Sequence, residues 1–145
     1  MNATIKKFGY PDLLLKEYDY WVILLRPDQV TLSSLIIACK EEEESFSDIS
    51  IAAHNELKIV IHNTENVLKD TFHCNKINYL ALMMVDKHVH FHVIPRYSSK
   101  VEFNEKQYHD RNWPKAPILS DVIDIETEQL KALQSVLINK FNDEL

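Results

Sequence analysis

The sequence predicts an α+β fold with an antiparallel sheet. Along the chain, short strands come before and after one long helix, and a second helix lies near the end of the sequence. Its 145 residues are 46% hydrophobic and 26% charged. That composition is ordinary for a globular protein, and the length is close to the usual size of one domain. We therefore expect a single domain over residues 1–145. Apolar runs of strand length and two stretches with helical spacing predict the order of its elements.

The first two apolar runs predict a hairpin. Residues 20–25 and 35–38 are short and partly β-branched, and a polar turn follows the first of them at residues 26–29. Two such runs joined by turn residues are typical of an antiparallel strand pair.

A charged run at residues 40–44 then leaves the sheet, and we interpret it as solvated surface. Ser50 is a helix-capping residue type, so we expect a helix from residue 51 to about residue 68. Apolar residues at helical spacing along this segment predict the face that packs on the sheet. They are Ile51, Leu57, Val60, Ile61 and Leu68.

Residues 77–85 are apolar with almost no alternation, which indicates a strand buried on both faces at the centre of the sheet. Asp86 and Lys87 are expected to turn the chain, so that the following strand runs back beside this one. We expect Pro95 to end that strand, because proline has no backbone N–H to donate to a neighbour.

The rest of the chain predicts a loop and a helix. Residues 98–117 are expected to form a long ordered loop anchored by the aromatic residues Phe103, Tyr108 and Trp113. Thr127 is a suitable cap for the final helix. Its apolar stripe is Leu130, Leu133, Val136, Leu137 and Phe141.

The most informative pattern is a row of alternating histidines at His88, His90 and His92. Side chains on a strand point to opposite faces with period two. The three imidazoles therefore share one face, and Val89 and Phe91 share the other. The pattern predicts a strand with an apolar back and a polar front.

Three explanations for this row remain open on the residues alone. Imidazoles can decorate a hydrogen-bonded strand face, although histidine has no special strand propensity. They can also bind a metal ion, since neutral imidazole is a common ligand. The third explanation is a catalytic row, in which one imidazole attacks an electrophile while its neighbours hold the substrate. We favour the third.

The segment from His88 to His92, with the apolar pair Val93 and Ile94 after it, resembles the signature of the histidine triad family. The longer string His90–Tyr97 is similar to the bacterial, diadenosine-polyphosphate-hydrolase-like branch of that family. More loosely, the resemblance extends over residues 20–114. It implies a histidine triad-like fold: an antiparallel sheet of about five strands, a helix packed on it and a C-terminal helix. It also implies a homodimer, to which Met83 and Met84 are candidate contacts.

The resemblance also implies roles for the histidines. His90 matches the family's nucleophile, His92 matches the residue that contacts phosphate or ribose, and His88 matches the one that supports the nucleophile. The expected activity is that of a nucleotide hydrolase or nucleotidyl transferase that attacks the α-phosphate of a dinucleoside polyphosphate or another nucleotide conjugate. A covalent nucleotidyl-His90 intermediate would divide the reaction into two easier displacements. We expect no cofactor and assign no metal site.

The sequence departs from the family pattern at three places around the expected pocket. Ser33 and Ser34 stand where many members have a Gly-His pair, and Arg26 stands at the common asparagine contact to ribose. Residues 82–87 replace a Gly-Gln-Ser/Thr turn that offers donors to phosphate.

Asn78 is the candidate replacement donor, and Arg96 is a candidate for charge-assisted bonds to phosphate. We include both, together with Arg26, among the substrate-binding residues. An alternative follows from the same departures. The protein would then be a catalytically weak or inactive nucleotide-binding protein that keeps the triad strand.

Composition excludes several other function classes. A single glycine argues against a glycine-rich phosphate loop, and the formal charge of −6 argues against nucleic acid as a partner. Cys39 and Cys74 form no Cys-x-x-Cys motif and are expected to be reduced core thiols, which suits a cytoplasmic protein. No apolar run approaches the length of a membrane span, so we expect no membrane association. The expected partner is a small-molecule nucleotide.

Overall fold

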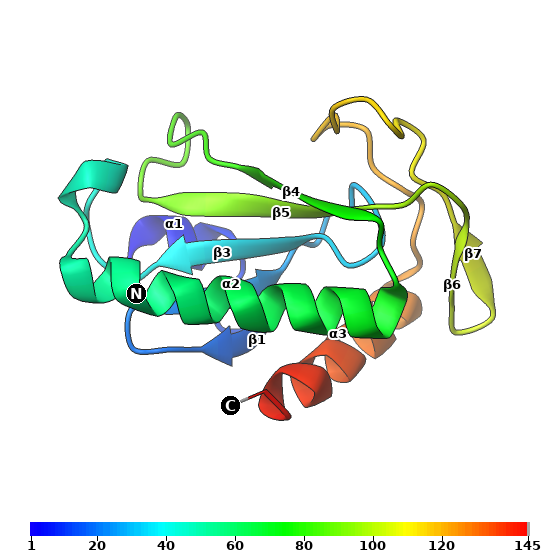
Figure 1. Ribbon diagram of the computed structural model, residues 1–145, viewed down its shortest axis with the longest axis horizontal. Helices are drawn as coiled ribbons and strands as arrows, with labels where there is room; N and C mark the ends of the chain where they lie inside the picture. The colour runs from blue at the N-terminus through cyan, green and yellow to red at the C-terminus, as the bar shows by residue number, and fades with distance from the viewer. Residues whose placement is uncertain (145) are drawn as a thin grey trace.

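The computed structural model describes residues 1–144, and its main feature is a five-stranded antiparallel sheet (Figure 1). The strands follow one another across the sheet in the order β1-β2-β3-β5-β4. In chain order, the elements are α1 (Ala3–Lys7), β1 (Leu14–Glu17), β2 (Trp21–Leu25), β3 (Leu35–Cys39), the 3₁₀ turn η1 (Phe46–Asp48), α2 (Ile51–Phe72), β4 (Lys76–Leu80), β5 (His90–Arg96), β6 (Val101–Phe103), β7 (Lys106–Tyr108) and α3 (Thr127–Asn142). This arrangement confirms the predicted α+β fold with a long helix and a C-terminal helix.

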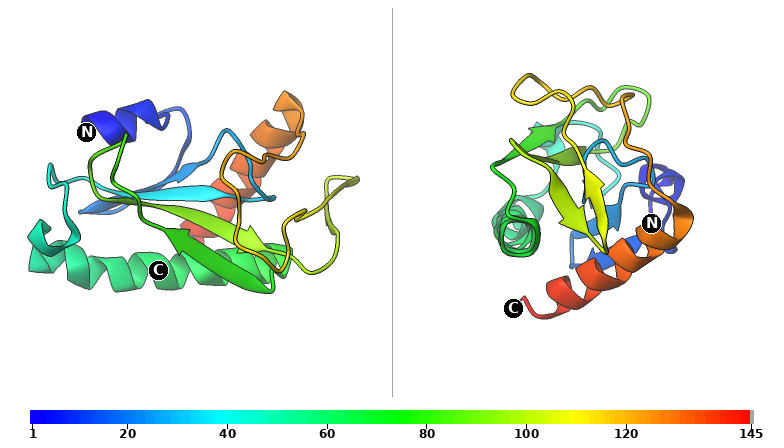
Figure 2. Two further views of the ribbon diagram at one scale, coloured as in Figure 1. Left: turned by 90° about the horizontal axis from the view of Figure 1, so that it is seen from above. Right: turned by 90° about the vertical axis from the view of Figure 1, so that its right-hand side faces the viewer.

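The two faces of the sheet are covered by different parts of the chain. On the back face, alternate strand residues pack with α2 and α3 into the larger apolar core, which includes Trp21, Phe91 and Phe141. On the front face, a smaller apolar cluster joins Ile5 of α1 to Ile36 of β3. Figure 2 shows α1 and α2 on opposite sides of the sheet. The strands β2, β3 and β5 are buried on both faces as a result.

The predicted hairpin is confirmed, because β2 and β3 pair as antiparallel neighbours in register. The connection between them is longer than the expected turn. It spans residues 26–34 and is held partly by Gln29, whose side chain exchanges hydrogen bonds with the backbone of Ser34.

Ser50 caps α2 as predicted, since its hydroxyl accepts a hydrogen bond of 3.1 Å from the backbone N–H of Ala53. The helix continues to Phe72, four residues beyond the expected end, and closes at His73 in a left-handed conformation. Val60 and Leu68 are fully buried, as the apolar stripe predicts, whereas Ile51 is 79% exposed. Placing Ile51 on the packed face of α2 was wrong, because Ala53 is the fully buried residue in that first turn and Ile51 lies outside the packed face.

The expectation of a central strand over residues 77–85 was wrong in position and length. The strand β4 ends at Leu80 and lies at one edge of the sheet, where its residues are only partly buried. Residues 81–89 form a loop, in which Met84 is 76% exposed and Val85 is 82% exposed. Apolar character here reflects an exposed surface rather than a core strand.

The strand β5 is an inner strand of the sheet, between β3 and the edge strand β4, and it pairs antiparallel with both. It runs one residue past Pro95, so the expectation that proline ends it was wrong. β3 pairs with β5 only as far as Val93, and the Pro95 carbonyl accepts a hydrogen bond from the Thr31 hydroxyl instead. Because Pro95 lies beyond the end of β3, its missing N–H disrupts no pairing on that side.

The C-terminal part also differs in detail from the prediction. The expected loop contains a short hairpin, β6 with β7, and Tyr108 is buried as an anchor. The final helix begins at Thr127 with Glu126 at the capping position, one residue before the predicted cap. Among the residues that the structure describes, no helix has both the length and the apolar character needed to cross a bilayer.

Candidate active site

Two of the three predicted histidines meet on the front face of the sheet. His90 and His92 are alternate residues of β5, both are buried, and their ring centroids lie 5.2 Å apart in a nearly perpendicular arrangement. His88 comes before the strand begins. The expectation that all three share one strand face is therefore wrong for His88.

The His88 ring is held by residues from elsewhere in the chain. Its Nδ1 lies 2.8 Å from the Thr4 hydroxyl of α1, and its Nε2 lies 3.1 Å from a carboxylate oxygen of Glu42. The same Thr4 oxygen accepts a hydrogen bond of 3.3 Å from the backbone N–H of His88. Three contacts thus fix the backbone at His88 as well as its ring.

This fixed backbone orients His90. The Nδ1 atom of His90 lies 2.7 Å from the carbonyl oxygen of His88. A carbonyl only accepts hydrogen bonds, so Nδ1 must carry the proton. In the neutral ring, the lone pair is then on Nε2, and this is the nitrogen available for nucleophilic attack.

His92 is kept neutral by its surroundings. Burial, together with the neighbouring Arg26 and His90, lowers the pKa of His92 to about 4. Its Nδ1 is buried and has no hydrogen-bond partner among the described residues. An unpartnered buried nitrogen costs about 1–3 kcal/mol. The ring of His92 lines a cavity, so its accessible part can contact a ligand there.

The two histidines line a cavity of about 290 Å³. Arg26, a predicted substrate-binding residue, lies in the same cavity, and Asp86 is on its wall. Phe8 closes another side, with its ring centroid 5.2 Å from that of His90 and 5.8 Å from that of His92. The remaining lining residues are Leu82, Met84, Val85 and Leu119. The cavity thus combines two imidazoles and a guanidinium with an apolar rim.

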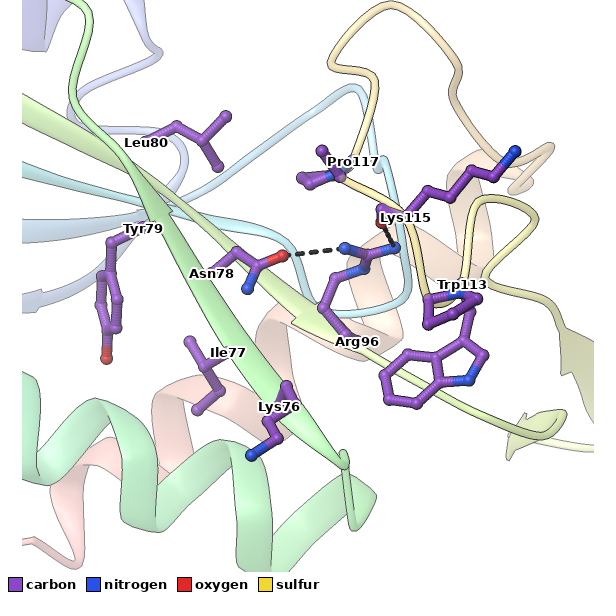
Figure 3. Close-up of a pocket in the computed structure, with 11 residues that line it drawn as sticks. Lys76, Ile77, Asn78, Tyr79, Leu80, Arg96, Trp113, Lys115 and Pro117 are labelled. Carbon is purple, nitrogen blue, oxygen red and sulfur yellow. Dashed lines mark hydrogen bonds between the residues drawn. The ribbon is translucent and has the colours of Figure 1, made fainter.

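Arg96 and Asn78 lie away from this cavity. The Arg96 guanidinium makes a buried ion pair with Asp110 at 2.7 Å and donates to the Asn78 side-chain oxygen at 2.8 Å. It also donates to the Lys115 carbonyl at 2.7 Å. Both residues line a second, larger pocket of about 730 Å³ (Figure 3). The structure therefore groups the predicted site residues in two places.

Sequence reasoning missed Thr4, Phe8 and Glu42. Thr4 is 84 residues from His88, and no motif connects the two positions. Ser33 and Ser34 stand at the expected Gly-His pair, but their hydroxyls form hydrogen bonds elsewhere. The Ser33 hydroxyl bonds to Leu32 and Tyr97, and the Ser34 hydroxyl bonds to Thr31. Support for the triad comes from α1 instead.

The remaining candidate groups supply no further chemistry. Cys39 and Cys74 are free and buried, as predicted, and burial raises the pKa of Cys39 to about 11. Within residues 1–144, no group of three or more His, Cys, Asp or Glu side chains is arranged to hold a metal ion.

Comparison with known proteins places the fold. No family model and no curated protein matches the sequence. Among solved structures, a histidine triad protein from Bradyrhizobium japonicum superposes with a TM-score of 0.73 at 17% identity, covering 97% of this chain and 96% of its own. A histidine triad protein from Sinorhizobium meliloti gives the same score and identity over 97% and 95%. A diadenosine triphosphate hydrolase from Plasmodium falciparum gives a TM-score of 0.65 at 11% identity, covering 99% of this chain and 80% of its own.

The chain has the fold of the histidine triad proteins. The predicted resemblance is thereby confirmed at the level of the fold, with His90 and His92 on an inner strand of its sheet. The bacterial diadenosine-polyphosphate-hydrolase-like branch stays a prediction.

Proposed function

We propose that this protein is a nucleotide hydrolase or nucleotidyl transferase that cleaves a nucleotide conjugate at its α-phosphate through a covalent nucleotidyl-His90 intermediate. The class of substrate includes dinucleoside polyphosphates and nucleoside phosphoramidates. Its fold, shared with a diadenosine triphosphate hydrolase among others, supports this class.

One observation carries the proposal. The His88 carbonyl at 2.7 Å fixes the proton of His90 on Nδ1 and so leaves the Nε2 lone pair free in a ring that lines the cavity. A nucleophile for phosphoryl transfer must be unprotonated at the attacking atom and held in position, and this hydrogen bond on an inner strand favours both conditions.

The chemistry follows in two steps. His90 Nε2 forms a bond to the α-phosphorus, and the bond from phosphorus to the leaving group breaks, with its electron pair leaving on that group. The ring of the intermediate is positively charged, and the His88 carbonyl dipole stabilises it through the Nδ1–H bond. Water then attacks phosphorus and loses a proton to solvent, and the P–N bond breaks to return the lone pair to His90. Arg26 and His92 are placed to contact the phosphate oxygens during both steps.

A second candidate function is nucleotide binding without turnover. It is favoured by the loop at residues 81–89, whose cavity-lining residues Leu82, Met84 and Val85 offer apolar side chains where donors to phosphate would be expected. Such a protein would bind nucleotides but release no product.

The test compares wild-type protein with His90→Ala on a panel of nucleotide conjugates, with product formation followed by chromatography. We expect a loss of at least about a thousandfold in turnover, as is usual for removal of a nucleophile. His62→Ala is the matched control, because His62 is an exposed histidine of α2 that bonds only to Asn66. Mass spectrometry after a denaturing quench at alkaline pH, where the P–N bond of a nucleotidyl-histidine is stable, should find the adduct on wild type alone. Unchanged turnover in His90→Ala would refute catalysis by the triad, and tight binding without product would establish the second candidate.

We also propose that the protein acts in the cytoplasm as a homodimer. Two observations support pairing: β4 is an edge strand of the sheet, and Ile59 on the neighbouring α2 is 52% exposed. Edge strands and exposed apolar side chains are common features of interfaces. Sedimentation equilibrium over a range of concentrations tests this, and a single monomer mass throughout would contradict it.

A further inference from the structure

The charged run that follows β3 has more contacts than a solvated surface requires. Residues 42–44 are exposed, as the sequence predicts. The register of the sheet nevertheless pairs Ala38, near the end of β3, with His90, at the start of β5. The segment that leaves β3 and the segment that enters β5 therefore lie at the same end of the sheet (Figure 1).

The Glu42 carboxylate determines the tautomer of the His88 ring. One carboxylate oxygen lies 3.1 Å from Nε2 of His88. An ionised carboxylate only accepts hydrogen bonds, so Nε2 carries the proton. In the neutral ring, Nδ1 is then an acceptor, and the Thr4 hydroxyl donates to it at 2.8 Å. The Thr4 oxygen accepts in turn from the backbone N–H of His88 at 3.3 Å, so one consistent hydrogen-bond pattern satisfies the ring and the backbone N–H.

The peptide group between His88 and Val89 is held at both of its polar atoms. Its carbonyl oxygen lies 2.7 Å from Nδ1 of His90. Its N–H, which belongs to Val89, donates to the Glu43 carbonyl at 3.2 Å. Hydrogen bonds in such a chain polarise one another, so the bond at the N–H strengthens the carbonyl as an acceptor for His90. Residues 42 and 43 thus hold both the His88 ring and the peptide group that orients the nucleophile.

The backbone that carries Glu42 is itself anchored to the rest of the fold. The Glu41 carboxylate accepts a hydrogen bond of 2.8 Å from the backbone N–H of Ser50, the capping residue of α2. The buried Asn2 side chain donates to the Cys39 carbonyl at 2.8 Å and to the Glu41 carbonyl at 3.1 Å. Because this backbone is already ordered, Glu42 loses less conformational entropy in bonding to the ring than it would from a mobile loop.

We propose that Glu42 is a positioning residue for His90. It holds the His88 ring in one tautomer and one orientation, and thereby fixes the carbonyl that keeps the proton of His90 on Nδ1. The inference rests on the proposed function and deepens it, because it gives a role to a carboxylate that does not line the histidine cavity. Since Glu42 does not touch the substrate, its removal should slow the chemical step and leave binding unchanged.

Nitrogen NMR of the histidine rings tests this role without any substrate. At about pH 8, above the usual pKa of histidine, the ¹⁵N shifts of wild type should show His88 with its proton on Nε2 and His90 with its proton on Nδ1. Glu42→Ala should give a mixture of tautomers at both rings and leave the shifts of His92 unchanged. Glu42→Gln keeps an oxygen acceptor and should preserve both tautomers. The matched control is Glu44→Ala, which removes an exposed carboxylate two residues along and should change no ring. A His90 ring that keeps its wild-type shifts in Glu42→Ala would overturn the proposal.

Kinetics on any nucleotide conjugate that wild type turns over provide the second readout. We expect kcat of Glu42→Ala to fall about fivefold, the size expected for the loss of one hydrogen bond, with KM within about twofold. Glu42→Gln should recover most of the rate, and Glu44→Ala should match wild type. An equal loss in Glu44→Ala, or a Gln variant as slow as the Ala variant, would assign the effect to charge and overturn the positioning role. If wild type turns over no conjugate, the proposed function fails, and the NMR comparison still decides the role of Glu42.

Discussion

The two ends of β5 carry polar residues on the same face of the sheet, but these residues differ in how completely the protein satisfies their hydrogen bonds. At the His90 end, His92 has a buried nitrogen without a partner. At the Arg96 end, the guanidinium is bound by Asp110, Asn78 and the Lys115 carbonyl.

The difference indicates which end of β5 can bind a ligand. The Arg96 guanidinium is already bound by the protein, so it stabilises the fold and gains little from a ligand, whereas the rings of His90 and His92 line a cavity. The histidine end is therefore the end that can contact a ligand, and the arginine end is a scaffold.

The largest effect on this comparison should come from breaking the scaffold. Arg96→Met leaves the Asp110 carboxylate buried without its counter-ion, and we expect a loss of about 3–5 kcal/mol in the free energy of unfolding, measured by urea titration. Arg96→Met/Asp110→Leu should recover a large part of that loss, because no charge is left unpaired. A cost below about 1 kcal/mol for the single variant would mean that this end is not the scaffold described.

The next effect concerns His92 at the other end of β5, and it is a dependence of the free energy of unfolding on pH. The pKa of His92 falls from 6.5 to about 4 on folding, so the unfolded chain binds a proton more readily than the folded one. Stability from this group is present above pH 6.5 and is lost as the pH falls toward 4, by an amount of about 3 kcal/mol at most.

Carboxylates titrate in the same range, so the measurement compares wild type with His92→Gln, which cannot titrate at this position. The difference in free energy of unfolding between the two proteins should change between pH 6.5 and 4. A constant difference would contradict the buried, neutral state of His92.

The smallest effect should come from the residues that support His90, the proposed nucleophile. Thr4→Val removes the hydroxyl that bonds to the His88 ring and backbone and keeps the volume. We expect kcat to fall about tenfold, equivalent to ~1.4 kcal/mol, with KM nearly unchanged, because Thr4 positions His90 through His88 and does not touch substrate. Thr4→Ser retains the hydroxyl and should restore most of the activity. If Val and Ser variants behave alike, Thr4 has no positioning role.

Much of the fold was predictable because local patterns determine it. The strand period placed His90 and His92 on one face, and the Ser50 cap located the start of α2. Residues 81–85 misled the prediction, since periodicity cannot distinguish an apolar rim around a cavity from a buried strand.

The site was predictable only in part. The triad pattern pointed to the nucleophile, but the partners that orient it come from Thr4 and Glu42, which are remote in sequence. Arg96 was expected at the phosphate because its charge is visible in the sequence, whereas its pairing with Asp110 depends on how the chain returns after the β6–β7 hairpin. Long-range pairings of this kind are set by tertiary structure and leave no local signal.

The short helix α1 and Phe8, which follows it, lie against the cavity that His90 and His92 line. Asn2 is buried and bonds to the Cys39 carbonyl, and six residues later Phe8 packs on both histidine rings. Substitutions at Asn2 or Phe8 would therefore change the surroundings of His90 and His92 without changing any histidine.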